Sequence, residues 1–234
     1  MSEQLDKAFE ALKTYDWGME PNVLQPIDDA IISTHTDAAA RKELETRLIA
    51  VLKTEVPQPA KGAVCRALKT IGTAASVPAL APLLADEKLS HMARYALERI
   101  PAPEAGQALV TALPKATGKL KIGIISSLGA RGEDAAVAPL QALLADSDPA
   151  CAQSAALALG AIGSLAAAKV LVTSKPTAGN KTAMADASMA CAENLLASGN
   201  KAAAKATYEK LLGSSPSELV KLAATHGLQM CAAK

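Results

Sequence analysis

Leucines recur along the middle of this chain at nearly constant intervals. The recurring positions are Leu83, Leu113, Leu143 and Leu171. The tetrapeptide Leu-Leu-Ala-Asp occurs at both 83–86 and 143–146, each time after a short run of Val, Pro, Ala and Leu. A period of roughly 30 residues is typical of helical repeats, in which each unit buries its apolar face against its neighbours. The pattern predicts an all-α fold, an α-solenoid of stacked antiparallel helix pairs, in which Leu83 and Leu143 face the neighbouring units.

Glycine and proline interrupt the apolar pattern and divide residues 57–175 into four two-helix units. The expected first helices cover 60–71, 89–100, 119–128 and 149–162, and the second helices cover 76–84, 104–113, 134–144 and 165–172. Gly72, Gly129 and Gly163 occupy the same place in three units. A left-handed glycine there would permit a tight turn between the two helices, and Pro101 replaces it in the second unit.

The segments on either side are less regular but also have helical spacing. Residues 1–56 are expected to form capping helices, and residues 176–234 a helical hairpin followed by one last helix. That last helix has no sequence partner after it, which would fit an excerpt from a longer protein. We expect residues 1–234 to form a single elongated, curved repeat domain.

Composition narrows the range of partners. The 24 Lys and Arg against 23 Asp and Glu give a net charge of +1, and no basic run supplies the charge of a nucleic-acid binder. The amino-terminal segment has no signal-peptide pattern, and no apolar stretch is long enough to predict a membrane span. Half of the residues are hydrophobic but only 2% are aromatic, so Ala, Leu, Val and Ile must fill the core.

The unit Cys65-Arg66-Ala67-Leu68-Lys69-Thr70-Ile71-Gly72, followed by 77–86, resembles the short HEAT-like repeat, also called the phycobilisome-lyase HEAT repeat. The resemblance covers roughly residues 60–175. Residues 89–98 are similar to HEAT segments of large multidomain bacterial proteins, often exported ones. The resemblance implies a HEAT-like or armadillo-type superhelix that serves as a scaffold. Departures are the missing Ile-Gly turn of the second unit and Lys121-Ile122 in the third, where the family has Arg.

Few residues suggest chemistry. Four polar side chains share one helix face at i, i+3, i+4 and i+7, namely His91, Arg94, Tyr95 and Glu98. We interpret them as a contact between repeats, because neither a nucleophile nor a metal accompanies them. Asp148 is explained as the N-cap of the helix that starts at Pro149. The four cysteines lack ligand spacing and are expected to be buried thiols, although a disulfide between adjacent helices stays open.

The expected function is that of a non-catalytic scaffold that binds a protein, a peptide or neighbouring domains of a longer parent chain, without a cofactor or metal. The second helices of the units would present the partner-binding residues Gln107, Thr111, Gln141 and Lys169 on an extended surface. The alternative is a HEAT-like enzyme subunit, either bilin lyase-like or DNA-glycosylase-like. A glycosylase would need a basic cleft with aromatic side chains.

Overall fold

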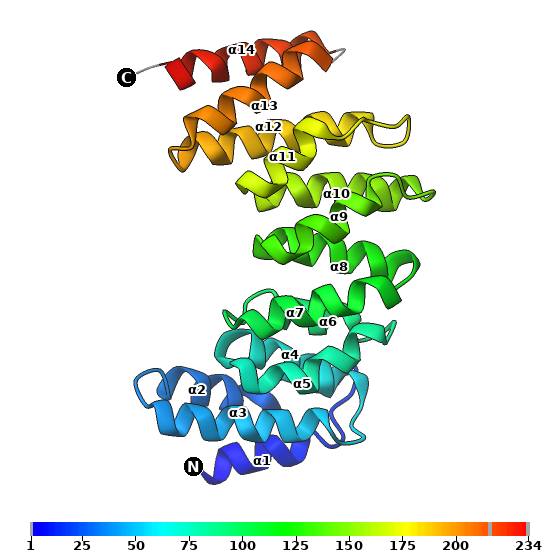
Figure 1. Ribbon diagram of the computed structural model, residues 1–234. Coiled ribbons are helices and arrows are strands. Elements are labelled where there is room, and N and C mark those ends of the chain that lie inside the picture. The colour runs from blue at the N-terminus through cyan, green and yellow to red at the C-terminus, as the bar shows by residue number, and fades with distance from the viewer. Residues whose placement is uncertain (1, 215–216, 233–234) are drawn as a thin grey trace. The chain divides into compact units, whose positions relative to one another are not determined.

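The computed structural model describes residues 2–214 and 217–232, and every regular element within these ranges is helical (Figure 1). The chain divides into two compact units, Met1–Ala116 and Thr117–Lys234. In each unit, helices pack on their neighbours in the sequence. The all-α class and the stacked helix pairs predicted from the sequence are therefore confirmed. A single domain over 1–234 stays a prediction.

The first unit begins with three helices and continues with two helix pairs. Its elements are α1 (Glu3–Ala11), η1 (Pro21–Leu24), α2 (Gln25–Ser33), α3 (Ala38–Leu52), α4 (Gln58–Ile71), η2 (Ala74–Ser76), α5 (Val77–Leu80), η3 (Ala81–Ala85), α6 (Ser90–Leu97), α7 (Pro103–Ala112) and η4 (Leu113–Lys115). The first helices of its pairs, α4 and α6, contact each other, and α3 packs on α4. The second helix of its first pair is broken into the short elements α5 and η3, because Pro78 and Pro82 divide it into α-helical and 3₁₀ turns.

The second unit consists of three helix pairs and a last helix. Its elements are α8 (Gly118–Arg131), η5 (Asp134–Ala136), α9 (Val137–Leu143), α10 (Pro149–Ile162), α11 (Leu165–Thr173), α12 (Lys181–Ala197), α13 (Lys201–Ser214) and α14 (Glu218–Ala232). The first helices form one layer, in which α10 lies between α8 and α12. The second helices form the other layer, in which α9 contacts α11 and α11 contacts α13.

Capping residues fix the ends of several helices at the places that the sequence predicts. The Asp148 carboxylate accepts from the Ala150 N–H at 2.9 Å, with Pro149 in the first helical turn, so the predicted N-cap is confirmed. At the other end of α10, Gly163 has a φ of 61° and closes the helix in the left-handed conformation. The predicted helix 149–162 matches α10 because both of these signals are local.

Two of the three predicted turn glycines have other roles. Gly72 is extended, with φ −63° and ψ 144°, and a Cβ on it would lie 2.9 Å from Ile100 Cδ1. Gly129 lies inside α8, where a Cβ would come within 2.9 Å of the Cα of Ala158. The left-handed residue of that pair is Gly132, with a φ of 66°. The predicted left-handed turn is thus wrong at Gly72 and Gly129, where close packing excludes a side chain, and correct at Gly163.

The core consists mainly of leucine, isoleucine and alanine, and the second leucine of each repeated tetrapeptide is the buried one. Leu84 and Leu144 are 2% and 5% exposed. Leu83 and Leu143, which the register predicted to face the neighbouring units, are only half-buried. The prediction missed by one position because the buried residues follow the i, i+3, i+7 spacing of one helix face, as Val77, Leu80 and Leu84 do, and Leu83 and Leu143 lie beside that face.

Buried polar side chains join successive pairs within each unit. In the first unit, the Glu45 carboxylate on α3 accepts from the Thr73 N–H at 2.7 Å and from the Ser76 hydroxyl at 2.6 Å. In the second unit, the buried Asn180 amide donates to the carbonyl of Leu144 at 2.7 Å. Each bond satisfies groups in a loop between helices, where a buried polar group left without a partner would cost about 1–3 kcal/mol.

Candidate functional site

The second helices of the second unit present a row of exposed side chains opposite their buried face. Val137 and Leu140 of α9 are buried, as are Val170 and Leu171 of α11. The exposed side chains of this row, named here the second-helix face, are Ala138, Gln141, Ala142, Leu165, Ala166, Lys169, Ala202, Lys205, Ala206 and Glu209. Since α9, α11 and α13 contact one another in order, these side chains form one surface.

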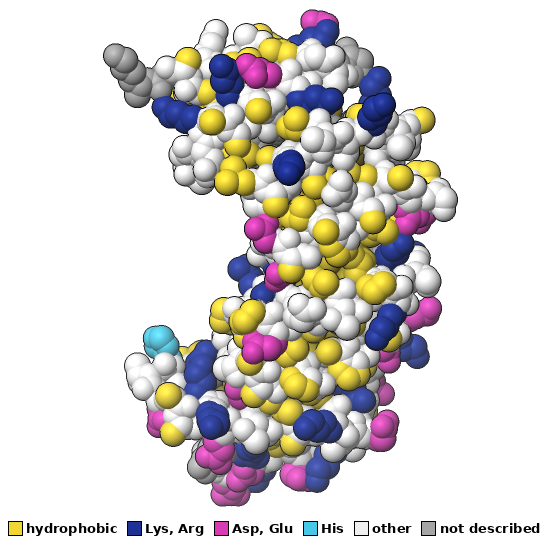
Figure 2. Space-filling model, viewed as in Figure 1, with side chains coloured by type: hydrophobic (Ala, Val, Ile, Leu, Met, Phe, Trp, Pro, Cys, Tyr) yellow, Lys and Arg dark blue, Asp and Glu magenta, His cyan; other side chains and the backbone are white. Residues whose placement is uncertain are grey.

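Two of the predicted partner-binding residues belong to the second-helix face. Gln141 is exposed on α9, and Lys169 is exposed on α11 one turn after Leu165, whose side chain is 58% exposed. Small alanine side chains flank both residues, so another chain could approach the backbone closely. In Figure 2, hydrophobic side chains gather in the middle of the visible face of this unit, and most charged groups lie toward its margins.

The other two predicted residues lie in the first unit. Gln107 and Thr111 are exposed on α7, one helical turn apart, and the Gln107 amide donates to the Thr111 hydroxyl at 3.3 Å. The structure thus places Gln141 and Lys169 on one face of the second unit, and Gln107 and Thr111 on one helix of the first unit. All four side chains are exposed. Their role in binding stays a prediction.

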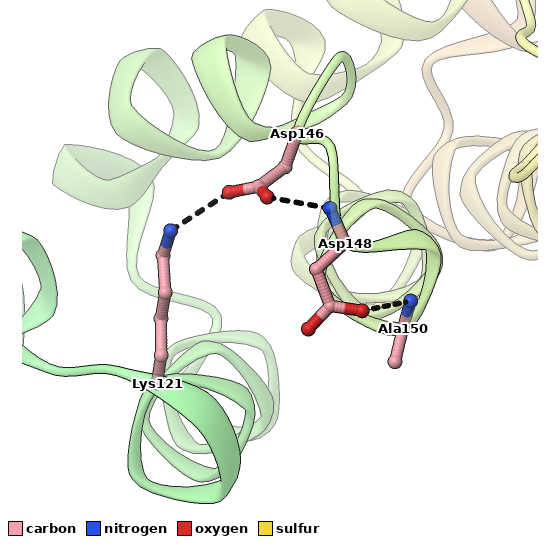
Figure 3. Close-up of polar contacts among 4 residues, drawn as sticks. All are labelled: Lys121, Asp146, Asp148 and Ala150. Atoms are coloured by element: carbon pink, nitrogen blue, oxygen red, sulfur yellow. Dashed lines mark hydrogen bonds and ion pairs between the residues drawn. The ribbon is translucent and has the colours of Figure 1, made fainter.

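Lys121 and Asp146 form a half-buried ion pair in the second unit (Figure 3). The Lys121 Nζ of α8 lies 2.8 Å from Asp146 Oδ2, in the loop between α9 and α10. The other oxygen of Asp146 accepts from the Asp148 N–H at 3.0 Å. The donation from Lys121 and this backbone bond lower the pKa of Asp146 to about 2. The pair fastens the loop to α8 and is a structural contact.

Asp86, which ends the same tetrapeptide in the first unit, has a different set of partners from Asp146. Asp86 Oδ1 accepts from the N–H groups of Lys88 and Leu89, at 2.8 and 3.0 Å. Asp86 therefore closes the turn that leads into α6, whereas in the second unit Asp148 caps α10 directly. Oδ1 of both Asp86 and Asp146 accepts from a backbone N–H two residues later, and Asp146 differs because its Oδ2 also accepts from Lys121. These residues are accounted for as turn and cap, as the sequence predicted for Asp148.

The polar patch on α6 is also a contact between repeats. His91 stacks on Tyr95 with ring centroids 6.5 Å apart. Lys69 of α4 lies 4.0 Å from the centre of the Tyr95 ring and donates to its hydroxyl. Burial lowers the pKa of Arg94, and the nearby negative charge of Glu98 partly offsets this lowering. The predicted contact of Tyr95 with the neighbouring repeat is confirmed, although its side chain stays 36% exposed.

Thiols and acidic residues of the described ranges make no recognised reactive centre. All four cysteines are free. Cys65, Cys151 and Cys191 are buried, as predicted, whereas Cys231 is only half-buried, so the prediction is wrong at that position. Burial raises the pKa of Cys65 to about 12 and that of Cys191 to about 11, which opposes thiolate formation. Within residues 2–214 and 217–232, no group of three or more His, Cys, Asp or Glu could hold a metal ion. Among the same residues, no helix is long and apolar enough to cross a bilayer.

Sequence reasoning missed a groove in the first unit. It has a volume of about 280 Å³ and lies between the loop after α1, the start of α4 and α6. The lining residues of this tryptophan groove are Tyr15, Asp16, Trp17, Gly18, Met19, Gln58, Pro59, Gly62, Arg66, Leu89 and Met92. The available signal was that the chain's single tryptophan lies in a loop, where no helical face needs it for packing.

Comparison with known proteins identifies the repeat. Residues 106–187, which include all of α8 to α11, match the family model for HEAT repeats. No curated protein matches the chain significantly in sequence. The phycobilisome-lyase type of repeat stays a prediction, because the match does not distinguish it. Over residues 106–187 the chain is thus similar to HEAT repeats, and the stacked helix pairs of the described residues are consistent with a HEAT-type helical solenoid.

Proposed function

We propose that this protein is a non-catalytic scaffold that binds a protein or peptide through its second-helix face. The observation that carries the proposal is the exposed row on α9, α11 and α13, in which Leu165 is 58% exposed between alanines and few charges. Stacked repeats offer such rows as extended binding surfaces. Exposed large apolar groups surrounded by polar ones are typical of protein interaction sites.

The ionic character of the face favours a partner with at least one carboxylate. Lys169 makes no ion pair with any Asp or Glu of the described residues, whereas Lys205 lies 3.7 Å from Glu209. A carboxylate on the partner could pair with Lys169 at the edge of the contact. Such a rim charge affects the rate of association and its salt dependence more than the affinity.

Site-specific photocrosslinking in the native host tests the proposal. A photoreactive residue at Gln141 or Lys169 should capture a partner, and one at exposed Ala161 on α10 serves as the control on the first-helix layer. The double variant Gln141→Glu and Lys169→Glu should reduce capture at a third position, Ala206, at least about tenfold, equal to about 1.4 kcal/mol. Both substitutions are exposed and should leave unfolding by urea unchanged.

A separate pair of variants tests the predicted residues of the first unit. The double variant Gln107→Glu and Thr111→Glu should weaken binding of the same partner if α7 also contributes to the binding surface. Loss of binding only with His91→Ala and Arg94→Ala would place the site on α6 and contradict the proposal. A bound visible chromophore in protein purified from its native host would instead support the bilin lyase-like alternative.

A further inference from the structure

We propose that the tryptophan groove of the first unit binds a short peptide segment in which a bulky apolar side chain is followed by a carboxylate. The inference rests on the proposed function as an interaction scaffold and adds a second site with its own ligand chemistry. It is carried by an exposed aromatic side chain, an apolar groove beside it, and a cation in the groove wall that forms no ion pair within the described residues.

The first step is the exposure of apolar side chains at the groove. The single tryptophan of the chain, Trp17, has a side chain that is 78% exposed, and Met19 beside it is 40% exposed. Tryptophan is enriched among the residues that dominate binding energy. Neither side chain contributes to the core of the unit, which leaves both of them available to cover an apolar group of a partner.

The second step is the order of the loop that holds Trp17. The Trp17 N–H donates to the Asp16 carboxylate at 2.7 Å, and the Met19 N–H donates to the Asp16 carbonyl at 3.2 Å. Gly18 has a φ of 86°, which completes the turn and which other residues rarely adopt. A backbone fixed in this way places Trp17 without a large loss of conformational entropy on binding.

The third step is the room inside the groove. Gly62 of α4 forms part of its wall, and a Cβ at this position would lie 3.8 Å from Met92 Cγ, in ordinary contact. Met92 and Met19 are long and unbranched, so they can adapt to different apolar side chains. The volume of about 280 Å³ accommodates a leucine or phenylalanine side chain but is small for a folded domain surface.

The fourth step is the charge. Arg66 is exposed in the groove wall and forms no ion pair with an Asp or Glu of the described residues. Asp16, the acidic residue of the lining, already accepts from the Trp17 N–H. A carboxylate on the ligand would therefore find an available guanidinium, and such a pair can be bidentate. Arg66 therefore favours a ligand with a carboxylate near its guanidinium.

Fluorescence anisotropy with labelled peptides tests the inference. The probe is a seven-residue peptide of Gly and Ser with Phe-Asp at its centre, and the two control peptides carry Ala-Asp or Phe-Asn there. The Phe-Asp peptide should bind the full chain saturably, with a Kd below about 1 mM. The Ala-Asp peptide should bind at least about tenfold more weakly, and the Phe-Asn peptide about threefold to tenfold.

Variants locate the binding. Trp17→Ala should weaken binding of the Phe-Asp peptide roughly 30-fold, which equals the roughly 2 kcal/mol of a binding hot spot. Trp17→Phe should restore part of this affinity. Arg66→Gln should weaken the Phe-Asp peptide to the level of the Phe-Asn peptide. The matched controls Ile32→Ala, which is 73% exposed in wild type, and Arg99→Gln should bind like wild type.

Several results would overturn the inference. They are no saturable binding up to about 1 mM, equal binding of all three peptides, or equal binding by wild type and Trp17→Ala. Trp17 and Arg66 are exposed, so their variants should keep the thermal midpoint within about 2–4 °C. The double variant Gln141→Glu and Lys169→Glu should bind the peptide like wild type. Failure of the groove would therefore be distinguished from failure of the second-helix face.

Discussion

The first helices of the repeats approach one another differently in the two units. In the second unit a Cβ on Gly160 would lie 2.6 Å from the Cα of Ala187, and one on Gly129 would lie 2.9 Å from the Cα of Ala158. In the first unit, the equivalent layer has Gly62 of α4 opposite the flexible side chain of Met92, where a Cβ would have its nearest contact at 3.8 Å.

The difference shows how small residues control the surface of a repeat protein. Glycine facing alanine lets two helix backbones come into contact, so the layer of α8, α10 and α12 is closed by the backbone itself. Where methionine separates the helices, space remains between α4 and α6. The tryptophan groove occupies part of that space. Residue size at a few positions therefore separates a purely structural layer from one with a candidate binding site.

The largest expected effect comes from truncation of the buried leucines that both units share. Leu144→Ala in the second unit and Leu84→Ala in the first should each reduce the free energy of unfolding by about 2–5 kcal/mol, through lost burial and a residual cavity. Leu143→Ala and Leu83→Ala should cost about 1 kcal/mol, because these side chains are half-buried. Equilibrium unfolding in urea measures the free energy of unfolding of all four variants. Equal losses for the two adjacent leucines of either tetrapeptide would contradict the observed register.

Glycine substitutions test the difference in helix spacing directly. Gly160→Ala should destabilise the protein by about 1–3 kcal/mol, because the new methyl group meets the Ala187 backbone and forces the helices apart. Gly62→Ala should be neutral or stabilising by up to about 1 kcal/mol, because alanine favours the helix and the space is open.

Gly213→Ala is the matched control for both glycine variants. Gly213 lies in α13 with no atom within 4 Å of a Cβ, so it reports helix propensity alone. Thermal and urea unfolding of the three variants should rank Gly160→Ala lowest. A Gly62→Ala variant as unstable as Gly160→Ala would show that the first unit is packed as tightly as the second.

The smallest effect concerns the ion pair that distinguishes Asp146 from Asp86. Lys121→Met should raise the pKa of Asp146 from about 2 toward the ordinary value of about 3.9, because the main donor to its carboxylate is removed. Since the folded-state pKa is depressed, the stabilisation is present above about pH 4 and is lost as the pH falls toward 2.

Carboxyl carbon shifts in NMR spectra follow this titration in wild type and variant. Lys61→Met is the matched control in the first unit, since Lys61 also lies on the first helix of a repeat and makes no ion pair among the described residues. It should leave the pKa of Asp146 unchanged. An unaltered pKa in Lys121→Met would mean that the remaining donors to the carboxylate, the Asp148 N–H and the Cys151 thiol, are enough to lower it.

Local signals along the chain were enough to predict the helical repeat and the limits of many helices. A cap such as Asp148, a proline in the first turn and a glycine after the last turn act within a few residues of where they stand. For the same reason Asp148 could be assigned as a cap. The lack of ligand spacing also predicted buried thiols, which is correct for three of the four cysteines.

Which residues face one another became known only from the packed helices. Whether Gly129 closes a turn or admits a neighbouring helix depends on Ala158 in the next helix pair, and no local pattern encodes that contact. The same holds for the bond between Lys121 and Asp146 and for the groove that Trp17 forms with residues of α4 and α6. Packing between elements sets helix rotation and spacing, because side-chain volumes from distant parts of the chain must fit together.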